Sequence, residues 1–127
     1  MSELAIIIED DEDLATIFTE ALQQAGYETE TIRDGLLAQK RVSVTQPHIV
    51  ILDMHIPIVS GADILKQIKA DGRLRETIII VTTADARMGE TMTDVADYVL
   101  IKPIAFTQLR DLAIRLHRRN NSTVTST

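Results

Sequence analysis

The chain has 127 residues and a mass of 14.1 kDa, which is the usual size of one domain. It contains no cysteine, so disulfide bonds, zinc thiolate sites and thiol nucleophiles are excluded. The formal net charge is −6, which argues against direct nucleic-acid binding, because proteins that bind a phosphate backbone present a basic surface.

The amino terminus carries no targeting signal. No basic segment precedes the apolar residues 4–8, and a run of acidic residues, 9–13, follows them directly. No apolar run approaches the roughly 20 residues that a membrane-spanning helix needs. We therefore expect a cytoplasmic protein that does not enter a membrane.

Strand-length apolar runs alternate with segments of helical periodicity. Runs rich in Ile and Val predict strands at residues 4–8, 29–32, 49–52, 78–81 and 99–101. Apolar residues at spacings of three and four predict helices at residues 14–25, 36–44, 64–68, 87–95 and 106–116. The helix over 87–95 is expected to be short or mobile, because Gly89, Thr91 and Thr93 lower helix propensity.

This alternation of strands and helices predicts the fold class. Strands separated by helices form a parallel sheet covered on both faces, and the first, third and fourth strands lack polar alternation, as doubly buried strands do. The sequence thus predicts an α/β fold, a doubly wound (βα)₅ domain over residues 1–118. Residues 119–127 are polar and aperiodic and are expected to form a tail or the start of a linker.

Chemically active side chains follow four of the predicted strands. Residues 9–11, Glu-Asp-Asp, follow the first strand, and Asp53 follows the third. Thr82 and Thr83 end the fourth strand, and Lys102 follows the fifth. Because ligands of open parallel sheets bind at the carboxyl ends of the strands, we expect these carboxylates, a hydroxyl and an amine to meet at one edge.

Such a group of carboxylates favours a hard cation. Two carboxylates about 4 Å apart repel by roughly 4 kcal/mol at an effective dielectric constant near 20. Oxygen ligands without cysteine select Mg²⁺, or Mn²⁺. Mg²⁺ beside a lysine ammonium and a threonine hydroxyl suits phosphoryl transfer, and an aspartate carboxylate can be the nucleophile. The sequence therefore suggests phosphoryl transfer onto an aspartate.

Four motifs at the ends of predicted strands resemble those of the receiver domains of two-component response regulators. They are residues 6–11 (IIIEDD), 49–61 (IVILDMHIPIVSG), 81–84 (VTTA) and 99–103 (VLIKP). The resemblance extends from residue 4 to about residue 118 and depends on all four motifs occurring in order. It implies a flavodoxin-like sheet with strand order 2-1-3-4-5.

The resemblance also implies how the residues act. Asp53 would accept a phosphoryl group from the phosphohistidine of a sensor histidine kinase or a phosphotransfer protein. Thr83 would hydrogen-bond the phosphoryl oxygens, Lys102 would pair with them, and the bond from Lys102 to Pro103 would be cis. The protein would be a switch, catalysing only its own phosphoryl acceptance and hydrolysis, and an output domain or effector protein would respond to it.

The metal site implied by the resemblance uses four residues. Asp11 and Asp53 would bind Mg²⁺ directly, and the backbone carbonyl of His55 would add a third protein ligand. Asp10 would act through water.

Two departures from the family pattern concern the fourth and fifth strands. Thr82 and Thr83 are adjacent, so their side chains point to opposite faces and only one is expected to reach the site. We assign Thr83, which a small residue follows, and interpret Thr82 as a packed strand residue. Val99 stands where many receivers carry an aromatic residue, with Tyr98 one position too early, and the segment from Thr83 to Lys102 is shorter than usual.

Two alternative functions are weighed against this prediction. A receiver fold that signals without phosphorylation fits Val99 and the shortened segment, but the complete set of Asp53, Thr83 and Lys102 argues against it. A phosphatase of the haloacid dehalogenase type needs a second Asp two residues after the nucleophile, where His55 stands. Glycine-rich nucleotide-binding motifs are absent from the sequence.

Overall fold

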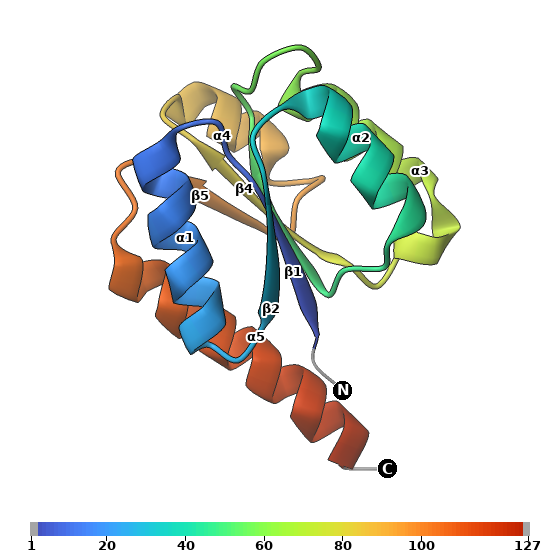
Figure 1. Cartoon of the computed structure of the whole chain (residues 1–127), viewed down its shortest axis with the longest axis vertical. Coiled ribbons are helices and arrows are strands. Elements are labelled where there is room, and N and C mark those ends of the chain that lie inside the picture. The colour runs from blue at the N-terminus through green and yellow to red at the C-terminus, as the bar shows by residue number, and fades with distance from the viewer. Residues whose placement is uncertain (1–2, 126–127) are drawn as a thin grey trace.

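The computed structural model describes residues 3–125, with side chains described for residues 3–117. Within these residues, strands β1 (Leu4–Ile8), β2 (Glu28–Ile32), β3 (Ile49–Asp53), β4 (Ile78–Thr83) and β5 (Tyr98–Ile101) form one parallel sheet. The strand order is β2-β1-β3-β4-β5 (Figure 1). This confirms the predicted doubly wound α/β fold and its strand order.

Helices connect the strands and cover both faces of the sheet. They are α1 (Glu12–Gln24), α2 (Gly35–Val44), α3 (Gly61–Ala70), the short 3₁₀ helix η1 (Gly72–Leu74), α4 (Ala86–Met92) and α5 (Phe106–Thr125). Figure 1 shows α1 and α5 on one side of the sheet and α2 and α3 on the other.

Polar residues begin the helices that follow β1, β2, β3 and β4. The side chains of Asp11, Asp34, Ser60 and Asp85 each accept a backbone N–H from the first turn of α1, α2, α3 and α4, respectively. These caps satisfy amides that have no partner within the helix. The caps of α1, α2 and α4 lie within three residues of the end of the preceding strand, whereas the cap of α3 lies seven residues after the end of β3.

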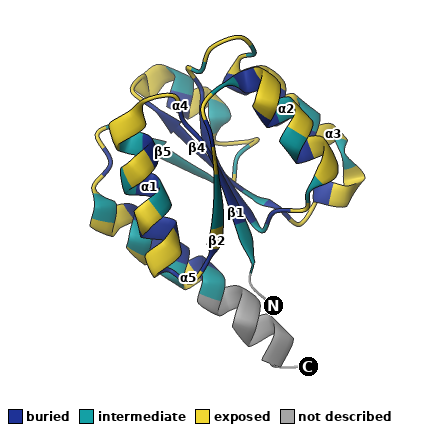
Figure 2. Cartoon of the chain, viewed as in Figure 1, coloured by how far each residue is buried: buried dark blue, intermediate teal, exposed yellow. Residues whose placement is uncertain are grey.

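The sheet separates two apolar cores. One contains Phe18 and Leu22 of α1 with Leu109 of α5 and alternate residues of the central strands. The other contains Ile64 and Ile68 of α3 with the remaining strand residues. Figure 2 shows the central strands buried and the outer helix faces exposed. The continuous apolar runs of β1, β3 and β4 are explained by this burial on both faces.

The structure differs from the sequence prediction at the carboxyl end. Residues 119–125, predicted to be a tail or linker, continue helix α5 through Thr125. No Gly or Pro interrupts this segment, and each residue added to an existing helix gains a backbone hydrogen bond without a new nucleation step. The polar composition of residues 119–125 therefore did not indicate where helix α5 ends.

Helix α4 confirms the prediction of a short element. It spans Ala86–Met92, where the sequence predicts 87–95. The earlier end is at Thr93, whose N–H bonds to the carbonyl oxygen of Glu90.

A polar and aromatic cluster lies at the amino end of the sheet, opposite the strand ends that carry the acidic residues. The Tyr27 ring stacks on His48 and meets the edge of His117 on α5. The Tyr27 hydroxyl lies 2.9 Å from His48 Nδ1, which is 3.0 Å from Glu3 Oε2. His117 thus helps to attach α5 to the residues that follow α1.

Candidate functional site

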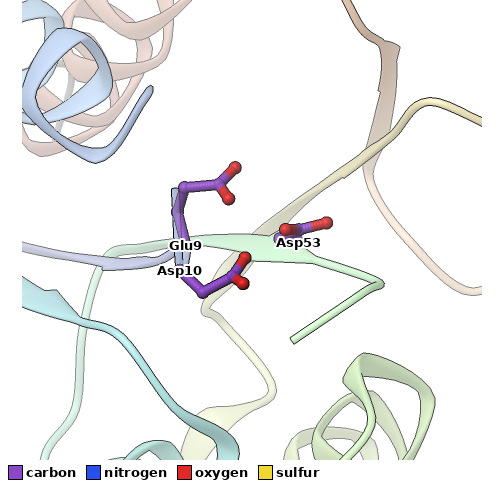
Figure 3. A group of neighbouring side chains, drawn as sticks. All are labelled: Glu9, Asp10 and Asp53. Carbon is purple, nitrogen blue, oxygen red and sulfur yellow. The ribbon is translucent and has the colours of Figure 1, made fainter. Parts of the chain in front are cut away.

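Three carboxylates gather at the carboxyl edge of the sheet. Carboxylate oxygens of Glu9, Asp10 and Asp53 all lie within 4.8 Å of one another (Figure 3). Glu9 and Asp10 directly follow β1, and Asp53 is the last residue of β3. Glu9 is 1% exposed and Asp53 2% exposed, whereas Asp10 is open to solvent. The cluster is therefore buried at Glu9 and Asp53 and open to solvent at Asp10.

Sheet register explains why Glu9 belongs to this cluster. Ala5 and Ile7 of β1 lie beside Ile49 and Ile51 of β3. Side chains alternate along strands, so Glu9, two residues after Ile7, follows the same face as Asp53. The sequence analysis did not assign Glu9, although this alternation was the signal that could have identified it.

Asp11, which the sequence analysis assigned to the metal, has a different position. It is the N-cap of α1, and its Oδ1 accepts the Leu14 N–H at 3.0 Å. Among the described residues it is not a member of the carboxylate cluster.

The loop that carries Asp10 is held by the end of β2. The Glu9 N–H donates to the Ile32 carbonyl oxygen at 3.0 Å. The Arg33 guanidinium donates two hydrogen bonds, at 2.7 and 3.1 Å, to the Asp10 carbonyl oxygen. These contacts fix the backbone from which the Glu9 and Asp10 side chains extend.

Lys102 brings a positive charge into the cluster. Its Nζ lies 2.9 Å from Glu9 Oε1 and 3.3 Å from Asp53 Oδ2. The following peptide bond, Lys102–Pro103, is cis, as the resemblance implies. One ammonium thus faces three carboxylates, which leaves the site negative when all are ionised.

The pKa values of two groups reflect this crowding. Burial raises the pKa of Glu9 to about 7, and hydrogen bonding and repulsion with Asp53 add to the effect, while Lys102 opposes it. Burial alone would lower the pKa of Lys102, but the hydrogen bond to Glu9 and the charges of both carboxylates outweigh it, so the Lys102 pKa is raised. Lys102 is therefore charged at neutral pH, while Glu9 is close to its titration point.

The His55 backbone contacts Asp53, whereas the Thr83 side chain lies on the other face of β4 and contacts α4, because Thr82 is the register neighbour of Asp53. The His55 backbone N–H donates to Asp53 Oδ1 at 3.0 Å, so the loop after β3 is tied to this carboxylate. The Thr83 hydroxyl accepts the Asp85 N–H at 3.0 Å and donates to Met88 Sδ at 3.9 Å. In this structure the Thr83 hydroxyl therefore bonds to the start of α4.

Val99, at the position where many receivers carry an aromatic residue, and Tyr98, one position earlier, lie on opposite faces of the sheet. Val99 packs with the core beneath α3 and α4, and Tyr98 packs with the core beneath α1 and α5. A Cβ atom on Gly89 would lie 3.2 Å from Val99 Cγ1 and 2.6 Å from Ile101 Cδ1. The backbone of α4 at Gly89 thus packs directly against the side chains of Val99 and Ile101 on β5.

The donor set fits a hard divalent cation. Carboxylate oxygens without sulfur or paired imidazoles are the ligands that Mg²⁺ prefers, and mutual repulsion of close carboxylates favours a bound cation. Beside them lies the Lys102 ammonium, 3.3 Å from Asp53 Oδ2. This arrangement can support phosphoryl transfer onto Asp53.

Fold and site together define a receiver domain. The chain matches the response regulator receiver domain family over residues 5–114, and it belongs to this family of two-component signalling proteins. Among the described residues, no helix is both long enough and apolar enough to cross a bilayer.

Individual relatives are consistent with this assignment. The chain is 33% identical over 90 residues to the polar-differentiation response regulator DivK of Brucella anthropi, covering 71% of this chain and 73% of that protein. Its fold is similar to that of the chemotaxis response regulator CheY4 of Vibrio cholerae, with a TM-score of 0.81 at 23% identity over 91% of this chain and 99% of the other. The receiver domain of a sensor histidine kinase from Pseudomonas aeruginosa, solved with a magnesium ion in its active-site cleft, gives a TM-score of 0.79 at 22% identity, covering 91% and 98%.

Proposed function

We propose that this chain is a Mg²⁺-dependent phosphorylation switch whose acceptor is Asp53. The phosphoryl donor is the phosphohistidine of a sensor histidine kinase or a phosphotransfer protein, in the cytoplasm. The observation that carries the proposal is the cluster of Glu9, Asp10 and Asp53 oxygens within 4.8 Å, with Lys102 Nζ 3.3 Å from Asp53.

The transfer step uses Asp53 as a nucleophile. A carboxylate oxygen of Asp53 forms a bond to phosphorus while the bond from phosphorus to the histidine nitrogen breaks. The imidazole keeps that electron pair and takes up a proton. Lys102 stays close enough to pair with the phosphoryl oxygens, whose charge it partly neutralises.

The metal ligands in this proposal are Glu9, Asp10 and Asp53, with the backbone carbonyl of His55 as a further ligand. Glu9 replaces Asp11, because Asp11 is engaged in capping α1. Bound Mg²⁺ supplies charge neutralisation for the phosphoryl oxygens. The Arg33 contacts to the Asp10 carbonyl oxygen keep the acidic loop in place for this role.

Thr83 couples the site to the surface. Thr82, beside Asp53 in the register of β3 and β4, would donate to the phosphoryl group, and movement of β4 toward that group would shift Thr83 and change its contacts with the start of α4. The altered surface around α4 and β5 is the one that an effector protein or output domain would recognise.

The test is phosphorylation in the absence of a kinase. Wild-type protein incubated with acetyl phosphate and Mg²⁺ should gain one phosphoryl group by intact mass. Asp53→Ala should gain none, while Asp63→Asn, a change in a capping-turn residue of α3, should behave as wild type. Mg²⁺ binding without any phosphoryl adduct would instead support a receiver fold that signals without phosphorylation.

A further inference from the structure

Arg33, which directly follows β2, is exposed, and its guanidinium forms no ion pair with any carboxylate among the described residues. Instead, Nε and Nη2 both donate to one neutral acceptor, the Asp10 carbonyl oxygen, at 3.1 and 2.7 Å. Two donors on one carbonyl oxygen restrict the direction in which that group can point. The arginine therefore acts on the backbone of the acidic loop rather than on a side chain.

The other end of the same peptide unit contacts Glu9. The peptide bond between Asp10 and Asp11 is planar, so its C=O and its N–H point in opposite directions. The C=O accepts from Arg33, and the N–H donates to Glu9 Oε2 at 3.2 Å. Because the peptide is rigid, a rotation that breaks the Arg33 contact also turns the N–H away from Glu9.

Glu9 continues this series of contacts to the acceptor. Its other oxygen, Oε1, lies 2.9 Å from Lys102 Nζ, and that Nζ lies 3.3 Å from Asp53 Oδ2. The Glu9 carboxylate is thus held from two sides, by a peptide N–H and by an ammonium group. These contacts fix the direction in which it faces Asp10 and Asp53, and they connect the exposed Arg33 to the acceptor carboxylate.

We propose that Arg33 is a positioning residue for the metal site, which holds Glu9 and Asp10 in their binding geometry through the Asp10–Asp11 peptide. The inference depends on the proposed function and adds to it a residue that touches neither the metal nor the phosphoryl group. Removal of a group that orients metal ligands commonly weakens metal binding by roughly 10 to 100-fold.

The sign of the effect distinguishes positioning from simple charge. A guanidinium repels a divalent cation, so if Arg33 acted only through its charge, its removal would strengthen Mg²⁺ binding. If Arg33 acts by holding the peptide, its removal weakens Mg²⁺ binding, because Glu9 and Asp10 lose their fixed arrangement. The two roles therefore predict opposite changes in the dissociation constant.

The experiment measures the Mg²⁺ dissociation constant of the full chain by titration calorimetry. Arg33→Ala should bind Mg²⁺ about tenfold more weakly than wild type. Arg33→Lys keeps the charge and a hydrogen-bond donor, so its dissociation constant should lie between those two. The matched control is Arg75→Ala, which removes an equal charge from an exposed position between η1 and β4 and should leave Mg²⁺ affinity unchanged.

The rate of phosphorylation by acetyl phosphate provides the second readout. Arg33→Ala should need about tenfold more Mg²⁺ for its half-maximal rate. It should reach the wild-type rate at saturating Mg²⁺, because Asp53 and Lys102 are unchanged. General structural damage would instead lower the maximal rate and the unfolding midpoint, whereas Arg33→Ala should unfold at nearly the wild-type denaturant concentration, since Arg33 is exposed.

An Mg²⁺ dissociation constant of Arg33→Ala equal to or below the wild-type value would overturn the inference. A reduced phosphorylation rate that saturating Mg²⁺ does not restore would overturn it as well. If wild type binds Mg²⁺ but accepts no phosphoryl group, the proposed function fails, while the Mg²⁺ titration of the variants decides the role of Arg33 separately.

Discussion

Glu9 is a buried carboxylate that also belongs to the acidic site. It is almost fully buried, it contacts Lys102, and it shares the site with Asp53 and Asp10. Burial of a carboxylate disfavours its charged form, which is why its pKa rises to about 7. Without a bound cation, the ionised Glu9 therefore lowers the stability of the fold.

This gives a pH dependence with a defined sign. The ordinary pKa of Glu9 is 4.5 and the folded value is about 7, so between these values the folded state holds a proton that the unfolded state has released. The free energy of unfolding should then fall as pH rises through this window and level off above it. For Glu9 the loss is roughly 3 kcal/mol at most.

Urea unfolding in the presence of a chelator, followed from pH 5 to pH 8, measures this effect. Glu9→Gln should lack the loss, so its stability relative to wild type should increase with pH. Glu12→Gln, at an exposed position in the first turn of α1, should follow the wild-type curve. If the free energy of unfolding changed with pH equally in Glu9→Gln and wild type, burial of Glu9 would not be the cause of the pH dependence.

At the scale of elements, α3 is placed by close contact with the end of β3. Gly61 is the first residue of α3, and a Cβ atom there would lie 2.6 Å from the Asp53 carbonyl oxygen and 2.6 Å from Met54 Cα. These are backbone atoms, which cannot move aside without displacing Asp53. The glycine that ends the second sequence motif therefore permits the helix to start against the acceptor residue.

Gly61→Ala should lower the free energy of unfolding by about 2 kcal/mol or more, as expected for a substitution that overpacks a buried contact. It should also slow phosphorylation by acetyl phosphate, because Asp53 is displaced. Gly72→Ala is the matched control, since a Cβ atom there meets nothing within 4 Å. The measurements are the free energy of unfolding by chemical denaturation and the rate of phosphorylation for both variants. Equal values for Gly61→Ala and Gly72→Ala would show that α3 can shift without displacing Asp53.

Comparison of these elements with the sequence shows what could be predicted. The strands were recognisable because β1, β3 and β4 are apolar on both faces, and Asp53 and Lys102 because they follow strands directly. Glu9 and Asp11 were harder to distinguish, since several acidic residues are adjacent and the choice depends on where the loop turns into α1. Thr82 and Thr83 could not be distinguished, because the sequence does not give the register of β4 against β3, which puts Thr82 beside Asp53 and Thr83 on the face of α4.

At the scale of the whole molecule, the acidic site is expected to couple metal binding to folding. The cluster draws on residues after β1 and on β3, so it exists only when the sheet is assembled. A ligand that binds the folded state alone stabilises it by mass action, by about 2.7 kcal/mol when its concentration is one hundred times its dissociation constant.

Thermal unfolding with and without Mg²⁺ tests the coupling and the ligand assignment together. Wild type should be stabilised by Mg²⁺, and Asp10→Asn should lose most of that gain. Asp11→Asn should retain it, because asparagine can still cap α1. Loss of the gain in Asp11→Asn alone would instead support Asp11 as the metal ligand.

The cluster at the amino end of the sheet affects how this molecule can be observed. The sequence has two tyrosines and no tryptophan, and Tyr27 is buried between two imidazoles at the edge remote from Asp53. Tyr98 begins β5 beside Ile80, which is only two residues before Thr82, the register neighbour of Asp53. Tyr27 is therefore the tyrosine suited to report loss of the fold without responding to occupancy of the acidic site.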